Sequence, residues 1–237
     1  MSVKRAVDLN EISDGSLYGA NDMVRADCGG CTGCSACCRG MGSSVILDPL
    51  DIYRLCAGLK CDFDMLLAGH LELNVVDAVI LPNLKMTGPK ESCSFLSPSG
   101  RCGIHAYRPG ICRLFPLGRY YENGTLRYFL QVHECKKENR AKIKVRKWLD
   151  MPDLKRYEKF VTDWHYFLND AEAAVAQEPD PEIRKGISLY LLQNFYRRPY
   201  GPIRPEQYVG EKDFYEQFDR RLAEARENLT IQPETTC

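Results

Sequence analysis

Five cysteines within eleven residues, in the run C-G-G-C-T-G-C-S-A-C-C from Cys28 to Cys38, constrain this chain more than any other feature. Five thiols packed this closely add nothing to an apolar core that alanine or valine would not supply. The run is therefore explained by cross-linking, by metal ligation or by redox chemistry. Four of its members have the C-x2-C-x2-C-x3-C spacing of a bacterial ferredoxin loop: Cys28, Cys31, Cys34 and Cys38.

Two features separate this run from a self-contained ferredoxin loop. Arg39 replaces the proline that usually follows the fourth cysteine, and Cys37 adds a fifth thiol beside Cys38. Adjacent side chains point in different directions, so these two thiols are better placed to bind different metal atoms than to share one. Further thiols lie downstream at Cys93, Cys102, Cys112 and Cys135.

The downstream cysteines and four members of the run make eight thiols, the number that two four-thiolate centres require. The four members are Cys31, Cys34, Cys37 and Cys38. The count fits two iron–sulfur clusters and two closed zinc sites equally well. Cys28 is a ninth thiol, a possible ligand without a settled role.

The compartment decides between metal and disulfides. The chain has 12 cysteines in 237 residues, yet its first residues contain no apolar run, so we expect no signal peptide. No window approaches the roughly 20 apolar residues of a membrane span. We therefore expect a cytoplasmic protein, where clustered thiols bind metal more often than they form bridges. Acidic and basic residues balance at 32 each, which gives no indication of a nucleic-acid or membrane partner.

A second dense stretch runs from Cys93 to Pro116, where proline and glycine recur too often for a regular helix or strand. Thiolate ligands would hold such turn-rich backbone together. From Cys93 to Arg119 there is no Asp or Glu, but four arginines: Arg101, Arg108, Arg113 and Arg119. A four-thiolate cluster or zinc site carries a charge of about minus two, which nearby guanidinium groups would offset. The alternative is a solvated basic loop.

The sequence predicts an α+β fold in three parts: a polar lead-in over 1–27, a metal-binding domain over 28–135, and a helical region over 136–237. Asp48-Pro49 predicts a helix start, Asp62 or Asp64 a second one, and Asn123-Gly124 a hairpin turn. Strands are expected at 43–47, 74–84 and on both sides of 123–124. Helices are expected at 50–58, from about 62 to 70, at 148–171 with an interruption near Pro152, and at 183–196 and 214–225.

Other cysteines and histidines have weaker indications. Cys56 and Cys61 fall in the first two predicted helices, where we interpret both as small buried hydrophobic residues. His105 and His133 lie near predicted ligands and are either structural histidines, hydrogen-bond donors to the ligands or alternative ligands.

Three segments together resemble the YkgJ-type cysteine-cluster proteins, a zinc- or iron-chelating family that includes the flagellin lysine N-methylases. They are C-T-G-C-S-A-C-C-R-G at 31–40, C-S-F-L at 93–96, and G-R-C-G-I-H-A-Y-R-P-G-I-C-R-L-F-P at 100–116. The resemblance covers about residues 28 to 135. Cys28 precedes the usual pattern, and His105 occupies a place where tyrosine is frequent.

The resemblance implies metal ligation by Cys31, Cys34, Cys37, Cys38, Cys93, Cys102, Cys112 and Cys135. Arg39, Arg108 and Arg113 are then candidates to contact the cofactor from behind these ligands. The methylase members imply an iron–sulfur centre used with S-adenosylmethionine to modify a lysine of a protein or peptide. No catalytic residue emerges from the sequence.

Two functions remain open. One is an enzyme with one or two 4Fe–4S clusters that uses S-adenosylmethionine; the other is a non-catalytic zinc, iron or electron-transfer module. The C-x3-C-x2-C triplet, G-x-G-x-x-G after a strand, and the P-loop are all missing from the chain, which favours the second reading. The partner is accordingly either a protein or peptide substrate or a redox protein, and the oligomeric state is left open.

Overall fold

The computed structural model describes residues 9–29, 34–201 and 211–229. The α-helices are α1 (Leu9–Ile12), α2 (Pro49–Leu59), α3 (Phe63–Gly69), α4 (Gly110–Leu114), α5 (Val145–Leu149), α6 (Leu154–Gln177), α7 (Pro181–Leu191) and α8 (Glu211–Asn228). Two short 3-10 turns are η1 (Ala36–Cys38) and η2 (His105–Tyr107), and α7 continues into the π-helical turn η3 (Leu192–Arg197). The strands are β1 (Met23–Asp27), β2 (Leu71–Val76), β3 (Val79–Leu84), β4 (Met86–Thr87), β5 (Ser92–Cys93), β6 (Leu117–Glu122), β7 (Thr125–Leu130) and β8 (Ala141–Lys144).

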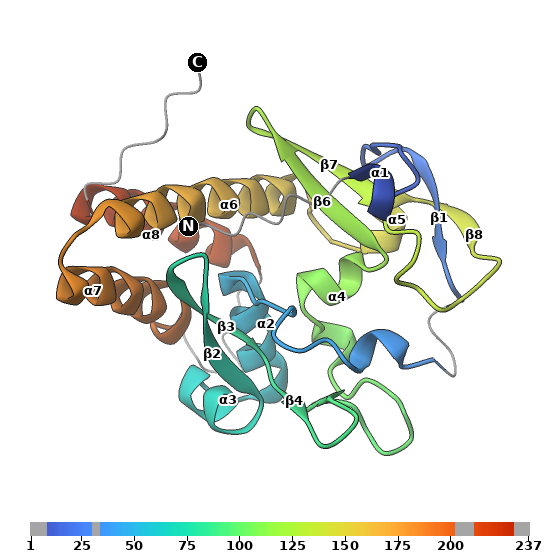
Figure 1. The fold of residues 1–237 in the computed structure, drawn as a ribbon, viewed down its shortest axis with the longest axis horizontal. Coiled ribbons are helices and arrows are strands. Elements are labelled where there is room, and N and C mark those ends of the chain that lie inside the picture. Colours follow the sequence, from blue (N-terminus) through green and yellow to red (C-terminus); the bar gives the residue numbers. More distant parts are fainter. Residues whose placement is uncertain (1–8, 30–33, 202–210, 230–237) are drawn as a thin grey trace.

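The long C-terminal helices lie on one side of the molecule, and α2 and α4 lie between them and the loops that carry the cysteines (Figure 1). The strands form separate antiparallel pairs: β1 with β8, β2 with β3, β4 with β5, and β6 with β7. This arrangement confirms the predicted α+β class with a helical C-terminal region. Within the described ranges, no helix combines the length and the apolar character needed to cross a bilayer.

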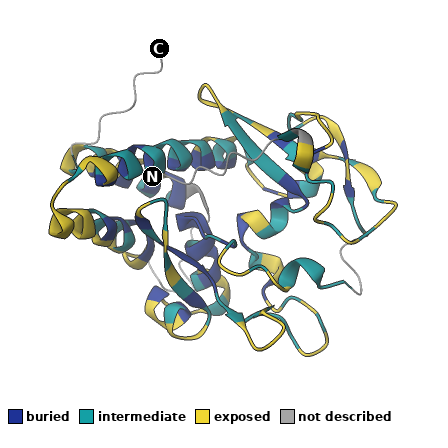
Figure 2. Ribbon diagram, viewed as in Figure 1, coloured by how far each residue is buried: buried dark blue, intermediate teal, exposed yellow. Residues whose placement is uncertain are grey.

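Aromatic side chains fill the core between α6, η3 and α8, and buried residues line the facing sides of these helices (Figure 2). Phe160 lies 4.6 Å from Phe218, and Trp164 lies 4.9 Å from Phe195, measured between ring centroids. Edge-to-face and tilted pairs at this distance add to the free energy gained from burying their area. The predicted amphipathic helix is confirmed, with its interruption between α5 and α6.

Both predicted helix starts in the first half are confirmed. Asp48 caps α2 by accepting a hydrogen bond from the backbone N–H of Asp51, and Pro49 is the first helical residue. Asp62, rather than Asp64, caps α3 and accepts from the N–H of Met65 at 2.8 Å. A carboxylate at this position satisfies one of the free amides of the first turn and complements the helix dipole.

One hairpin was predicted correctly and one was missed. Asn123 and Gly124 both have positive φ and join β6 to β7, as a two-residue turn with this pair requires. The single strand expected over 74–84 is wrong, because the chain reverses at 77–78 and forms the β2–β3 hairpin instead. Asp77 and Ala78 adopt positive φ there, and alanine gives no sequence signal for that conformation.

Three further local differences concern strands. Residues 43–47 run beside β3 through one isolated bridge, Ile46 to Asn83, and form no strand of their own. The continuous helical character expected from 136 onward is interrupted by β8, which pairs with β1. In β1 the side chains of Val24 and Ala26 are buried, so the end of the polar lead-in contributes to the core.

Candidate metal centre

Five thiols, here called the inner thiols, are brought together by four short segments. They are Cys37 and Cys38 in η1, Cys93 in β5, Cys102 in the following turn, and Cys112 in α4. These thiols lie within electrostatic range of one another: the Cys93 and Cys102 thiols each raise the pKa of Cys38 and of Cys112. The larger cause for Cys112 is its burial.

Cys37 and Cys38 hydrogen-bond to each other through their side chains. The donated S–H lowers the pKa of the Cys37 thiol to about 7, while the same bond raises the pKa of Cys38. The positive charge of Arg108 also lowers the Cys37 pKa. The thiolate is the form that binds metal, so Cys37 is available as a ligand near neutral pH.

Backbone hydrogen bonds fix the irregular segments that carry these thiols. The N–H of Gly40, just after η1, donates to the carbonyl of Glu91 beside β5 at 3.0 Å, and the N–H of Gly103 donates to Phe95 at 2.9 Å. Leu96 and Cys102 form an isolated antiparallel bridge. Backbone contacts therefore hold η1, β5 and the turn that carries Cys102 to one another, independently of any metal.

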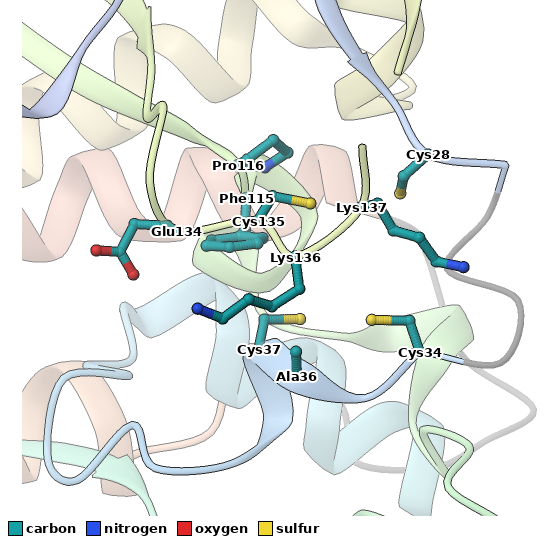
Figure 3. A pocket seen from close by; sticks show the side chains of 10 residues that line it. All are labelled: Cys28, Cys34, Ala36, Cys37, Phe115, Pro116, Glu134, Cys135, Lys136 and Lys137. Atoms are coloured by element: carbon teal, nitrogen blue, oxygen red, sulfur yellow. The ribbon is translucent and has the colours of Figure 1, made fainter. Parts of the chain in front are cut away.

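Four thiols from distant parts of the chain line one pocket, and we call them the pocket thiols: Cys28, Cys34, Cys37 and Cys135. In Figure 3 the sulfurs of Cys34 and Cys37 point toward each other across this space. Phe115 and Pro116 form part of the wall, and the side chains of Lys136 and Lys137 lie at its edge. Cys37 thus belongs to both groups and connects them.

The donor set fits a thiophilic metal. Among the described residues, no three His, Cys, Asp or Glu side chains already stand close enough to hold an ion, so binding has to draw thiols inward. Cys31, the remaining predicted ligand, lies outside the described residues. The Nε of Arg108 is buried and has no hydrogen-bond partner among those residues. An anionic sulfur beside it would supply that partner, which a neutral apolar site would not.

The other candidate arginines and histidines have different surroundings. Arg39 is exposed and donates to Ser92 Oγ at 2.6 Å, and Arg113 donates to the carbonyl of Ala106 at 2.7 Å, so both brace the loops. Exposed His105 lies 3.0 Å from Arg108, and burial together with the neighbouring guanidinium groups lowers its pKa. His133 is exposed in the loop before Cys135.

A buried polar cluster near the inner thiols was not predicted from the sequence. The Asp51 carboxylate accepts hydrogen bonds from the N–H of Gly110 at 2.7 Å and of Asp48 at 3.1 Å, and thereby ties α2 to α4. Burial raises the pKa of Asp51 to about 7. Arg119 points toward this cluster and donates to Tyr157 Oη in α6, so it does not join the cysteine loops as the sequence suggested. The only sequence signal was the Asp48-to-Asp51 spacing of a helix cap.

Cys56 and Cys61 lie away from the inner and pocket thiols, at the C-terminal end of α2. Both are half-buried and pack against the core. This position agrees with the interpretation of both as small hydrophobic residues, although neither is completely buried. Neither takes part in the thiol groups described above.

A close contact joins the same end of α2 to the second cysteine loop. The ring of Tyr107 lies so near Gly58 that a Cβ at that residue would come within 2.5 Å of the ring. We expect Gly58→Ala to destabilise the protein by about 1–3 kcal/mol, because the ring and the η2 loop would have to move. Urea unfolding measures the change. Gly186→Ala, within α7 and with no atom within 4 Å of its Cβ, should instead be neutral or stabilise by up to about 1 kcal/mol; equal effects of the two changes would contradict the contact.

The fold and the thiol groups define a small α+β protein with a cysteine-lined pocket beside a group of thiols. Comparison with protein families agrees: residues 30–135 match the family CxxCxxCC, described as a putative zinc- or iron-chelating domain. This match supports both the resemblance to the cysteine-cluster family and metal binding by this part of the chain. No curated protein and no solved structure matches the chain.

Proposed function

We propose that the chain binds two metal centres, each held by four thiolates. The inner centre would use Cys38, Cys93, Cys102 and Cys112. The pocket centre would use Cys34, Cys37 and Cys135 with Cys31, or with Cys28 in place of Cys31. The observation that carries this division is the position of Cys37 and Cys38: Cys37 lines the pocket and Cys38 does not, while the two thiols hydrogen-bond to each other.

We propose that both centres are iron–sulfur clusters of the 4Fe–4S type, which would supply one-electron redox chemistry. Two clusters held by neighbouring cysteines would bring much negative charge into a small space. Arg108 and Arg113 lie beside the loop around His105 and Ala106, where their positive charges would offset it. The pocket centre borders an opening with two lysines at its edge, so it is the one that a redox protein or a substrate would approach. Closed zinc sites with the same ligands are the second candidate, supported by the four-thiolate count.

Anaerobic purification followed by metal analysis and EPR spectroscopy separates the two candidates. Two 4Fe–4S clusters predict brown protein with about eight iron atoms per chain and an EPR signal after reduction. Colourless protein with about two zinc ions per chain would contradict the iron–sulfur proposal and support the zinc sites. Intermediate iron, near four atoms, would indicate one cluster and contradict the two-centre division.

A catalytic role is a separate proposal. We infer from the family resemblance that the pocket centre would work with S-adenosylmethionine to modify a lysine of a protein or peptide. Titration calorimetry of the reconstituted protein with S-adenosylmethionine tests it, and absence of binding would leave the electron-transfer or structural role. A reducing compartment keeps clustered thiols from forming disulfides before metal binds, and we therefore propose that the protein is cytoplasmic.

A further inference from the structure

We propose that Cys56 and Cys61 form a dithiol that is oxidised to a disulfide by low-molecular-weight disulfides, independently of the metal centres. The pair lies at the C-terminal end of α2, which ends at Leu59 and is followed by Lys60 in the left-handed conformation, with φ of 56°. The two thiols hydrogen-bond to each other. In the present state neither forms a disulfide.

The backbone at the end of α2 explains why these two side chains meet. The N–H of Cys61 donates at 3.1 Å to the carbonyl of Cys56, which lies five residues earlier in the chain. This bond and the left-handed Lys60 make up a Schellman motif, in which the third residue before the helix end and the second residue after it pack against each other. Cys56 and Cys61 occupy those two positions. The pairing is thus imposed by the helix end and does not depend on metal.

The surroundings of the two thiols assign different roles to them. Burial, together with the negative charges of Cys61 and Asp62, raises the pKa of the Cys56 thiol to about 12. Burial and Asp62 also raise the pKa of Cys61, but the hydrogen bond from Cys56 opposes this increase. Cys61 is the less deeply buried of the two. Cys61 is therefore the attacking thiolate, and Cys56 is the thiol that resolves the intermediate.

The reaction is balanced by two thiol–disulfide exchanges. The Cys61 thiolate attacks one sulfur of glutathione disulfide, forms a mixed disulfide and releases one glutathione thiolate. Cys56 then loses its proton, attacks the Cys61 sulfur and releases the second glutathione thiolate. The cysteine pair loses two electrons and two protons, and glutathione disulfide becomes two glutathione thiols. Because both steps need thiolate, the rate should rise about tenfold per pH unit near neutral pH.

The sequence between the two cysteines permits a direct test by mass spectrometry. Trypsin cleaves after Arg54, Lys60 and Lys85, so Cys56 and Cys61 fall in separate peptides, 55–60 and 61–85, each with a single cysteine. The metal-loaded full-length protein is incubated with glutathione disulfide, alkylated with N-ethylmaleimide and digested. We expect a cross-linked peptide pair, lighter than the sum of the two peptides by two hydrogen atoms, at unchanged metal content.

Single variants test the two roles. In Cys56→Ser, Cys61 should keep glutathione as a stable mixed disulfide, whereas in Cys61→Ser the half-buried Cys56 should be recovered as a maleimide adduct without glutathione. Recovery of both wild-type peptides as maleimide adducts, or as two separate glutathione adducts, would overturn the proposal. A cross-link that forms only as metal is released would also overturn it, because unfolding would then have exposed the thiols.

Discussion

Replacing Cys112 by serine is expected to remove about half of the bound metal, from about eight iron atoms per chain to about four if both centres are 4Fe–4S clusters. Cys112 lies in α4, and its thiol interacts with Cys93 and Cys102, so its loss removes one of the four ligands of the inner centre. A neutral serine hydroxyl is a poor substitute for a thiolate with iron or zinc. Metal analysis of protein purified anaerobically measures the loss, and the solubility of the variant should fall as well.

The control for this change is Cys56→Ser, which alters a half-buried thiol outside both groups. Its metal content should equal that of the unchanged protein. If Cys112→Ser keeps its full metal content, Cys112 is not a ligand and the proposed ligand set of the inner centre is wrong. If Cys56→Ser loses metal, the separation of the α2 dithiol from the metal site is wrong.

Asp51→Asn is expected to lower the free energy of unfolding by about 3 kcal/mol. The two carboxylate oxygens of Asp51 each accept a backbone N–H, one from Gly110 and one from Asp48. An asparagine has one oxygen and one NH2 group, so one buried donor would face another donor. Denaturant unfolding of the metal-loaded protein measures the loss, and metal should also be released to a chelator more quickly because Gly110 begins the helix that carries Cys112.

Asp62→Asn makes the same chemical change at an exposed helix cap. Asparagine caps helices about as well as aspartate, and Asp62 accepts a single N–H, from Met65. We expect a change within about 0.5 kcal/mol. Equal losses in the two variants would show that the bond from Asp51 to Gly110 contributes little to holding α2 and α4 together.

The sequence was most informative where a local rule decides the structure. Asp48 and Asp62 identified helix starts because a cap depends only on the residues beside it. Asn123-Gly124 identified the β6–β7 hairpin because few other pairs tolerate two positive φ angles in succession. The recurrence of apolar and aromatic residues three or four positions apart likewise indicated α6, whose buried face includes Phe160 and Trp164.

Features that depend on residues far apart in the chain could not be predicted from the sequence. The β2–β3 turn places Ala78 at positive φ, which the pairing of its flanking strands stabilises. Strand β8 forms because it pairs with β1, which lies more than a hundred residues earlier in the chain. The same limit applies to the site: spacing suggested that Cys37 and Cys38 have different partners, but only the fold brings Cys28 and Cys135 to one pocket.

The contacts that support the cysteine loops come partly from residues synthesised after the last predicted ligand. The indole Nε1 of Trp148 donates to the carbonyl of Leu114 at the end of α4, and the hydroxyl of Tyr196 donates to Leu47 just before α2. A nascent chain that has reached Cys135 already contains every predicted ligand but lacks these supports. We therefore expect the proposed metal centres to become stable only after Trp148 and Tyr196 have been added, and slow elongation after Cys135 should favour thiol oxidation or binding of the wrong metal.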